Sequence, residues 1–219
     1  MKKQARTIIM KNKGSRDLNY NKAFIICHGK SEYHIARYIK SNLRLPIFIF
    51  ANQNGATSIQ ITSLKSIFNR NDFKNIEKFG ETYNVEVIGS GKNATLAENF
   101  RIYIIMDTDD CTEKQKTDFI NKQMFKKYPL GKYVYPVYNI KNIEDVLCKT
   151  NIMTKRIKNS EKGNFYAKVF PISSNNSNGT KSEFENFQKQ LEAIKPRPED
   201  YTNMHEMVQE LIALAKKKK

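Results

Sequence analysis

Residues 102–110 read IYIIMDTDD, five apolar residues followed at once by four polar or acidic ones. An unbroken apolar run of this length is typical of a strand that is buried on both faces of a sheet. The acidic residues would then lie at the carboxyl end of that strand, where open α/β sheets bind their ligands. This stretch therefore predicts a central strand and, directly after it, a candidate site.

Similar apolar runs occur on both sides of this stretch, at 24–27, 46–51, 85–88 and 133–140. Between the runs, apolar residues recur at spacings of three and four, as with Ile35, Ile39 and Leu43. That spacing is typical of a helix with one apolar face. The alternation of strands and helices predicts an α/β fold, with a mainly parallel sheet flanked by helices.

Composition divides the chain into four parts. We expect a basic N-terminal arm, an α/β domain, a flexible loop or linker rich in Ser and Asn, and a small helical C-terminal extension. These parts cover residues 1–21, 22–172, 173–181 and 182–219. Within the extension, two amphipathic helices are predicted on either side of the Lys-Pro-Arg-Pro sequence at 195–198.

The charge of the chain indicates a polyanionic partner. Its 219 residues include 38 Lys and Arg against 22 Asp and Glu, which gives a net charge of +16. Such an excess favours binding to nucleic acid or to an anionic membrane surface. A general bias toward Lys and Asn would produce the same composition.

The apolar segments and the cysteines indicate a cytoplasmic protein without a membrane partner. No stretch approaches the ~18 apolar residues of a membrane-spanning helix, and the basic N-terminus lacks the apolar core of a signal peptide. Cys27, Cys111 and Cys148 show no CxxC spacing and are odd in number. They fit reduced thiols rather than disulfides or a zinc site.

Asp107 and Asp109 are the first candidate metal ligands. Residues i and i+2 of an extended chain point to the same side, so these two carboxylates could face one cation. Mg²⁺ is commonly held by one or two carboxylates together with waters and substrate phosphates. Alternatively, the acidic residues only cap the helix that follows.

The sequence HGKSE at 28–32 is the second candidate, because it also follows a predicted strand. Gly29 allows a tight strand-to-helix turn, and Lys30 would lie at a helix N-terminus suited to anions. Glu32 could reach a metal or act as a general base. A surface Glu32 that only offsets the helix dipole is the alternative.

These two motifs together resemble the Toprim fold over residues 22–150, most closely the RloB-like and OLD-like nucleases of phage-defence and abortive-infection systems. The resemblance implies a nuclease that depends on Mg²⁺ or Mn²⁺. Gly29 matches the turn glycine and Glu32 the second acidic residue of the Glu-Gly-x-x-Glu motif. Asp107 and Asp109 match the metal-binding pair, and Glu144 matches an acidic residue after a later strand.

His28 departs from this resemblance, because the family usually has Glu there as a metal ligand or general base. Histidine can also accept a proton or bind a metal. Its neutral nitrogen would hold Mg²⁺ less well and Mn²⁺ relatively better. Either the chemistry is retuned or the activity is reduced.

A basic segment with interleaved aromatic residues follows the predicted α/β core. Its side chains could bind phosphates and stack on bases, although a solvated loop would have the same composition. The candidate nucleic-acid contacts are Lys30, Lys155, Arg156, Lys158, Tyr166 and Lys168.

The preferred hypothesis is metal-dependent cleavage of nucleic-acid phosphodiester bonds, with RNA or tRNA suggested only by the resemblance. Asp107, Asp109, Glu32 and Glu144 would hold the metal. Glu32 or His28 would accept the proton, and Lys30 would anchor the substrate. The alternatives are a catalytically weakened nucleic-acid-binding protein and a toxin subunit regulated by a partner. The C-terminal helices could form that interface or the seam of a homodimer.

Overall fold

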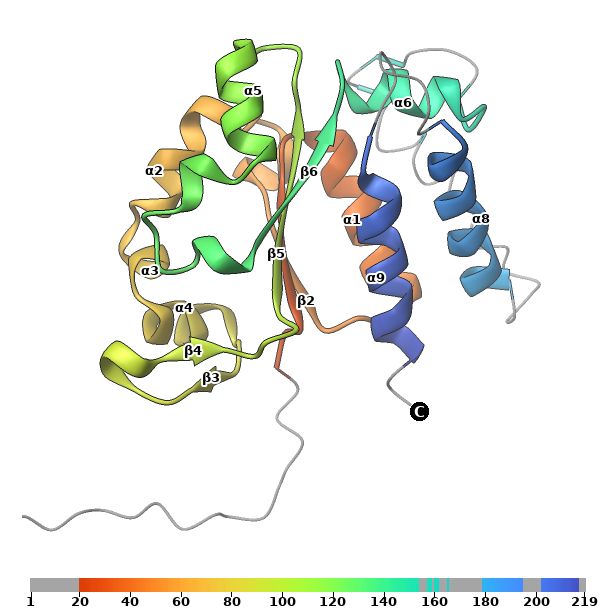
Figure 1. The fold of residues 1–219 in the computed structure, drawn as a ribbon. Helices are drawn as coiled ribbons and strands as arrows, with labels where there is room; N and C mark the ends of the chain where they lie inside the picture. The colour runs from red at the N-terminus through yellow and green to blue at the C-terminus, as the bar shows by residue number, and fades with distance from the viewer. Residues whose placement is uncertain are drawn as a thin grey trace, which may run out of the picture.

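A four-stranded parallel sheet forms the centre of the molecule (Figure 1). The computed structural model describes residues 20–153, 157–158, 160–161, 165, 179–194 and 202–216. The strands are β1 Ala23–Cys27, β2 Ile47–Phe50, β5 Arg101–Asp107 and β6 Val134–Asn139, in the order β2-β1-β5-β6. All three pairings of neighbouring strands in this sheet are parallel, so their carboxyl ends lie at one edge.

The two inner strands are buried on both faces, as their unbroken apolar runs predict. All five residues of β1 are buried, and so are six of the seven residues of β5. Because side chains alternate along a strand, Ile25 and Tyr103 face one layer of helices while Phe24 and Ile104 face the other. The predicted α/β class, with a mainly parallel sheet flanked by helices, is therefore confirmed.

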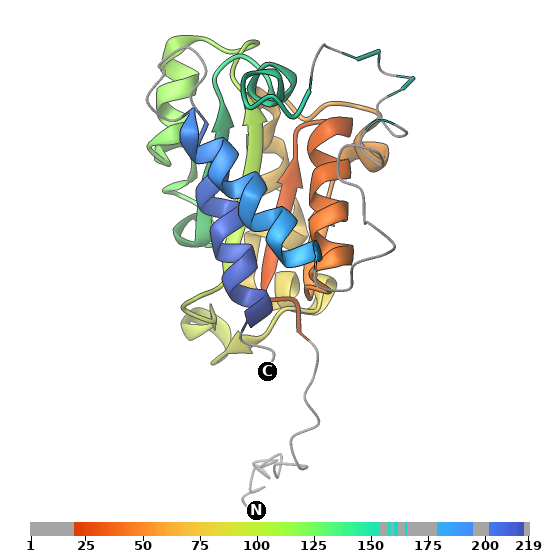
Figure 2. The ribbon, with the colours of Figure 1, turned by 90° about the vertical axis from the view of Figure 1, so that its right-hand side faces the viewer.

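Among the described residues, four helices cover one face of the sheet. These are α1 Lys30–Asn42, α6 Ile143–Lys149, α8 Gly179–Ala193 and α9 Met204–Lys216. Figure 2 shows α8 and α9 lying across this face beside α1. Their apolar side chains, including Phe184 and Leu211, share one core cluster with Ile25 and Tyr103 of the sheet.

The two C-terminal helices form where the spacing of apolar residues predicts them, but they are not a separate extension. They complete the layer that buries this face of the sheet, so they belong to the same hydrophobic core as α1. The spacing of apolar residues identifies the buried side of a helix. It contains no information on which surface covers that side.

The opposite face is covered by short helices and an aromatic core. The helices are α2 Leu64–Phe68, α3 Asn71–Lys74, α4 Ile76–Tyr83 and α5 Glu113–Ile120, and single turns of 3-10 helix occupy Ile61–Ser63, Gln123–Phe125 and Gly131–Tyr133. The aromatic core consists of Phe24, Phe68, Phe73, Phe79 and Tyr83, whose rings contact one another edge-on or tilted.

Only the last two residues of the run at 85–88 form a strand, and it lies outside the main sheet. β3 Val87–Ile88 pairs antiparallel with β4 Thr95–Leu96, and a 3-10 turn at Gly91–Asn93 lies between them. Each of the helices in the described ranges is too short or too polar to pass through a bilayer. Residues 1–19 of the predicted arm and 173–178 of the predicted linker lie outside the described residues.

Candidate metal centre

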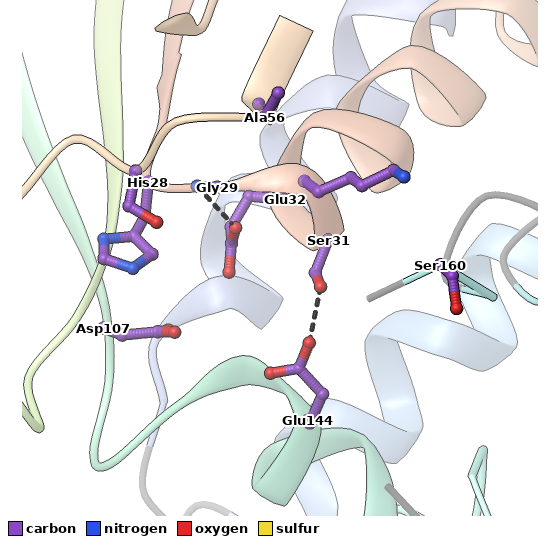
Figure 3. A pocket seen from close by; sticks show the side chains of 11 residues that line it. His28, Gly29, Ser31, Glu32, Ala56, Asp107, Glu144 and Ser160 are labelled. Atoms are coloured by element: carbon purple, nitrogen blue, oxygen red, sulfur yellow. Dashed lines mark hydrogen bonds between the residues drawn. The ribbon is translucent and has the colours of Figure 1, made fainter. Parts of the chain in front are cut away.

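A pocket of about 410 Å³ opens at the carboxyl edge of the sheet, where β1 and β5 end and where α1 and α6 begin. This position is the one expected for the ligand site of an open α/β sheet. We call it the acidic pocket; its ionisable and hydroxyl side chains include His28, Lys30, Ser31, Glu32, Asp107 and Glu144. Figure 3 shows the carboxylates of Glu32, Asp107 and Glu144 pointing toward one another across it.

Glu32 is held by the turn between β1 and α1. Gly29 is the N-cap of α1, and the carboxylate of Glu32 reaches back to it, with Oε2 accepting a hydrogen bond from the Gly29 backbone N–H at 2.8 Å. The other oxygen, Oε1, is buried and accepts no hydrogen bond from the residues that the structure describes. An ionised oxygen in that position costs free energy unless a ligand or a proton satisfies it.

Gly55 allows a second loop to lie directly on this turn. It ends the 3-10 turn Asn52–Gly55 with a φ of 86°, and a Cβ there would lie 2.8 Å from both the carbonyl oxygen of Gly29 and the Cα of Lys30. Only glycine combines that conformation with that approach. The sequence predicts a turn at Asn-Gln-Asn-Gly, but its contact with Gly29 depends on the tertiary structure.

Asp107 is the last residue of β5 and is only 6% exposed. Its Oδ1 accepts hydrogen bonds from the side-chain amide of Asn139 and from the backbone N–H of Ile143, both at 3.1 Å. Ile143 is the first residue of α6, so Asp107 also anchors the start of that helix. The predicted capping of the helix that follows is not made by Asp107, because Thr112 caps α5. Asp107 instead supports the start of α6 while it lines the pocket.

Glu144 joins the pocket from the first turn of α6. Its Oε1 accepts a hydrogen bond from the Ser31 hydroxyl at 2.5 Å, which links α6 to the first turn of α1 (Figure 3). Three separate elements thus contribute one carboxylate each. The sequence indicates Glu32 and Glu144 as candidates, but nothing in it identifies Ser31 as the hydrogen-bond donor to Glu144.

Burial and mutual repulsion raise the pKa values of two of these carboxyl groups, Asp107 and Glu32. Burial raises the pKa of Asp107 well above its usual range, the charges of Glu32 and Glu144 add to the rise, and the hydrogen bond from Asn139 opposes it. Burial also raises the pKa of Glu32, where the neighbouring His28 acts in the opposite direction. The pocket therefore favours either bound protons or a bound cation.

His28 has a defined orientation beside these acids. Its Nδ1 lies 2.9 Å from the carbonyl oxygen of Ile59. Because a carbonyl only accepts, Nδ1 must carry the hydrogen, which leaves Nε2 as the acceptor nitrogen of the neutral ring. The backbone of His28 is fixed as well, since its N–H donates to Ile105 and its carbonyl accepts from Ile59.

Asp109 is not brought into the acidic pocket. The strand ends at Asp107, and the N–H of Thr108 donates to the carbonyl oxygens of Asn139 and Lys141, so the chain turns there. Asp109 lies exposed in that turn and is not among the pocket-lining residues. The predicted i, i+2 pair requires an extended backbone, which β5 does not continue beyond Asp107.

No ready-made chelating group is present in the part of the chain that the structure describes. Within these ranges, no three His, Cys, Asp or Glu side chains are grouped closely enough to hold a metal ion by themselves. The donor chemistry of Glu32, Asp107 and Glu144 still suits a hard cation. Mg²⁺ commonly keeps several waters and takes only one or two carboxylates directly, so a hydrated ion needs no closed protein cage.

The predicted nucleic-acid contacts are only partly described. Lys30 lines the acidic pocket, and Lys158 is exposed on the surface. Ser160, which sequence reasoning did not single out, lies at the rim of the pocket. Lys155, Arg156, Tyr166 and Lys168 lie outside the described residues.

No family model, curated protein or solved structure matches this chain. The assignment of a function therefore depends on the geometry and chemistry of the acidic pocket.

Proposed function

We propose that the acidic pocket binds a divalent cation, Mg²⁺ or Mn²⁺, and cleaves phosphodiester bonds of nucleic acid. The observation that carries this proposal is the meeting of Glu32, Asp107 and Glu144, from three separate elements, in one pocket beside Lys30. The order of the turn glycine, Glu32 and Asp107 along a parallel sheet also supports a Toprim-like domain.

The unsatisfied oxygen of Glu32 is what argues for a cation here. Glu32 is 1% exposed, and its Oε1 has no hydrogen-bond partner among the described residues. The neighbouring carboxylates of Asp107 and Glu144 add to the electrostatic cost of its charge. A bound cation would remove both penalties at once. Glu32 and Asp107 are the residues expected to hold it, with Glu144 supporting it directly or through water.

Each remaining group has a role in hydrolysis by an attacking water. When bound, a divalent cation supplies positive charge that stabilises the negative charge on a phosphoryl oxygen. The Nε2 of His28 accepts the proton that the water loses as its oxygen attacks phosphorus. Lys30, at the N-terminus of α1, neutralises a neighbouring phosphate and orients the backbone. The bond between phosphorus and the leaving oxygen then breaks, and the leaving oxygen takes up a proton from water.

The net charge of +16 supports a nucleic-acid substrate. Much of a nuclease's affinity comes from phosphate contacts, so binding should weaken steeply as salt is raised. The proposal includes RNA or tRNA as the substrate, a role in phage defence, and a cytoplasmic location.

The test is a cleavage assay on RNA and DNA with Mg²⁺ or Mn²⁺. Asp107→Asn should reduce cleavage by about 100-fold or more, because it removes one charge from the proposed cation site. Glu81→Gln is the matched control, since Glu81 is an exposed carboxylate on α4. Both variants are checked for folding by circular dichroism. Undiminished cleavage by folded Asp107→Asn would refute the proposal.

A second candidate is a binding protein that has lost turnover, or a toxin subunit that a partner activates. It is favoured by His28 in place of an acidic residue and by the exposed position of Asp109 outside the pocket. This candidate predicts salt-sensitive binding of nucleic acid without cleavage, and no rise in melting temperature on adding Mn²⁺. A rise that disappears in Asp107→Asn would count against it.

A further inference from the structure

The C-terminal part of the chain reaches Asp107 through a buried chain of hydrogen bonds. Asn139 Nδ2 donates to Asp107 Oδ1 at 3.1 Å, and the hydroxyl of Thr202 donates to Asn139 Oδ1 at 2.9 Å. Asn139 and Thr202 are each 0% exposed. The network therefore excludes solvent and links the acidic pocket to the segment that begins α9.

The hydroxyl of Thr202 has a defined donor direction. Its oxygen accepts the backbone N–H of Met204 at 3.1 Å, at the start of α9, and its hydrogen is left for Asn139 Oδ1. This contact determines which end of the Asn139 amide faces each neighbour. With the carbonyl oxygen turned to Thr202, the amide N–H turns to the carboxylate of Asp107.

The backbone around Asn139 is held equally firmly. Asn139 forms an antiparallel bridge with Thr202, and its carbonyl oxygen accepts both the N–H and the hydroxyl of Thr108. One residue further on, the side chain of Asn203 satisfies the edge of β6, donating to Pro136 O and accepting from Tyr138 N. Thr202 and Asn203 thus form hydrogen bonds with the outer edge of β6, near its carboxyl end.

We propose that Asn139 and Thr202 are positioning residues for Asp107, and that the segment leading into α9 is therefore part of the functional site. Asn139, itself held by Thr202, and the backbone N–H of Ile143 both donate to Asp107 Oδ1. With that oxygen held, the carboxylate is directed into the pocket (Figure 3). This inference rests on the proposed cation site. Residues that hydrogen-bond to a metal-binding side chain without touching the metal typically contribute about 10- to 100-fold to metal affinity.

The experiment uses the full chain and measures Mn²⁺ affinity by electron paramagnetic resonance of the free ion. Thr202→Val removes one hydroxyl at nearly constant volume and should weaken Mn²⁺ binding about tenfold or more. Thr202→Ser keeps the hydroxyl and should bind within about threefold of the natural chain. Asn139 itself is left unchanged because its replacement risks misfolding.

Tyr103→Phe is the matched control. Tyr103 also ties the sheet to α9 through one hydroxyl, which donates to Glu210, but it lies four residues before Asp107 on β5. The Tyr103→Phe substitution should lower the melting temperature without changing Mn²⁺ affinity. If Thr202→Val is folded and binds Mn²⁺ like the natural chain, or if Tyr103→Phe weakens binding equally, the positioning role is overturned while the cation site stands.

A second measurement separates this inference from the proposed function. Hydrogen exchange of the Asn139 side-chain amide, followed by ¹⁵N NMR, reports its orientation with no metal present. We expect slow exchange in the natural chain and in Thr202→Ser, and exchange at least about tenfold faster in Thr202→Val. If the natural chain binds no Mn²⁺, the proposed function fails. Unchanged exchange in Thr202→Val overturns the positioning by Thr202 in either case.

Discussion

The aromatic core and the acidic pocket differ in how their polar groups are placed. The polar group of the core is hydrogen-bonded at its edge, whereas those of the pocket lie close together. In the aromatic core, rings bury one another and the hydroxyl of Tyr83 donates to Asp72 at the edge of the cluster. In the acidic pocket, three carboxylates face one another, and Glu32 Oε1 is buried with no hydrogen-bond partner in the described part of the chain. We expect the first region to stabilise the fold and the buried carboxylates of the second to lower its stability.

Phe79→Ala should have the largest effect on stability. Phe79 is fully buried and its ring lies 5.2 Å from that of Phe24 and 5.4 Å from that of Phe73, so truncation leaves a cavity. We expect a loss of about 3–5 kcal/mol in the free energy of unfolding, measured by urea titration. A loss below about 1 kcal/mol would mean that the aromatic core does not carry the stability assigned to it.

Gly55→Ala should come next. The substitution places a Cβ 2.8 Å from the backbone of the β1–α1 turn at a φ of 86°, so the loop must move. We expect a loss of about 1–3 kcal/mol together with weaker Mn²⁺ binding. Gly91→Ala is the control, because Gly91 also has a positive φ of 57° but nothing lies within 4 Å of the added Cβ. Equal effects on Mn²⁺ binding would show that backbone conformation, not the contact with Gly29, matters.

Glu32→Gln should raise the stability of the metal-free protein, whereas Phe79→Ala and Gly55→Ala lower it. It replaces a buried carboxylate with a neutral group of the same shape, and we expect a gain of about 1 kcal/mol in metal-free buffer near pH 8. The same change should abolish the stabilising effect of added Mn²⁺. Lower stability at pH 8 in the absence of metal would contradict the idea that this charge is a cost.

The sign of the pH dependence follows from the raised pKa values. Because the folded state binds a proton at Glu32 and Asp107 more tightly than the unfolded chain does, their protonation stabilises the fold. Stability should therefore fall as pH rises from about 4, the ordinary pKa of a carboxyl group, through the raised folded-state pKa. Glu32→Gln should flatten this slope in urea titrations from pH 4 to 8. Its gain should thus be larger at pH 8 than at pH 5.

Asp109→Asn should have the smallest effect. The residue is exposed and outside the pocket, so we expect less than about 0.5 kcal/mol in stability and less than about threefold in Mn²⁺ affinity. A loss comparable to that of Asp107→Asn would show that Asp109 enters the site when the cation binds, as the resemblance to Toprim nucleases implies.

Much of the fold could be predicted because buried positions produce regular patterns of apolar residues in the sequence. Unbroken apolar runs identify β1 and β5, and spacings of three and four identify α1, α8 and α9. The place of the run at 85–88 could not be predicted, since a short apolar run does not specify its partner; it pairs with β4 outside the main sheet. The candidate site was partly predictable, because residues after parallel strands must gather at one edge.

The sequence alone determined the alternating α/β architecture, the excess of positive charge, and the clusters after three of the strands that contain His28, Glu32, Asp107 and Glu144. Only the tertiary structure decided that Asp109 lies outside the pocket, that Gly55 seats a loop on the turn at Gly29, and that Asn139 and Thr202 hold Asp107. The physical reason is the distance along the chain over which each effect acts. Periodicity and turn chemistry act over a few neighbouring residues, whereas the direction of a carboxylate depends on hydrogen bonds from elements far away in the chain.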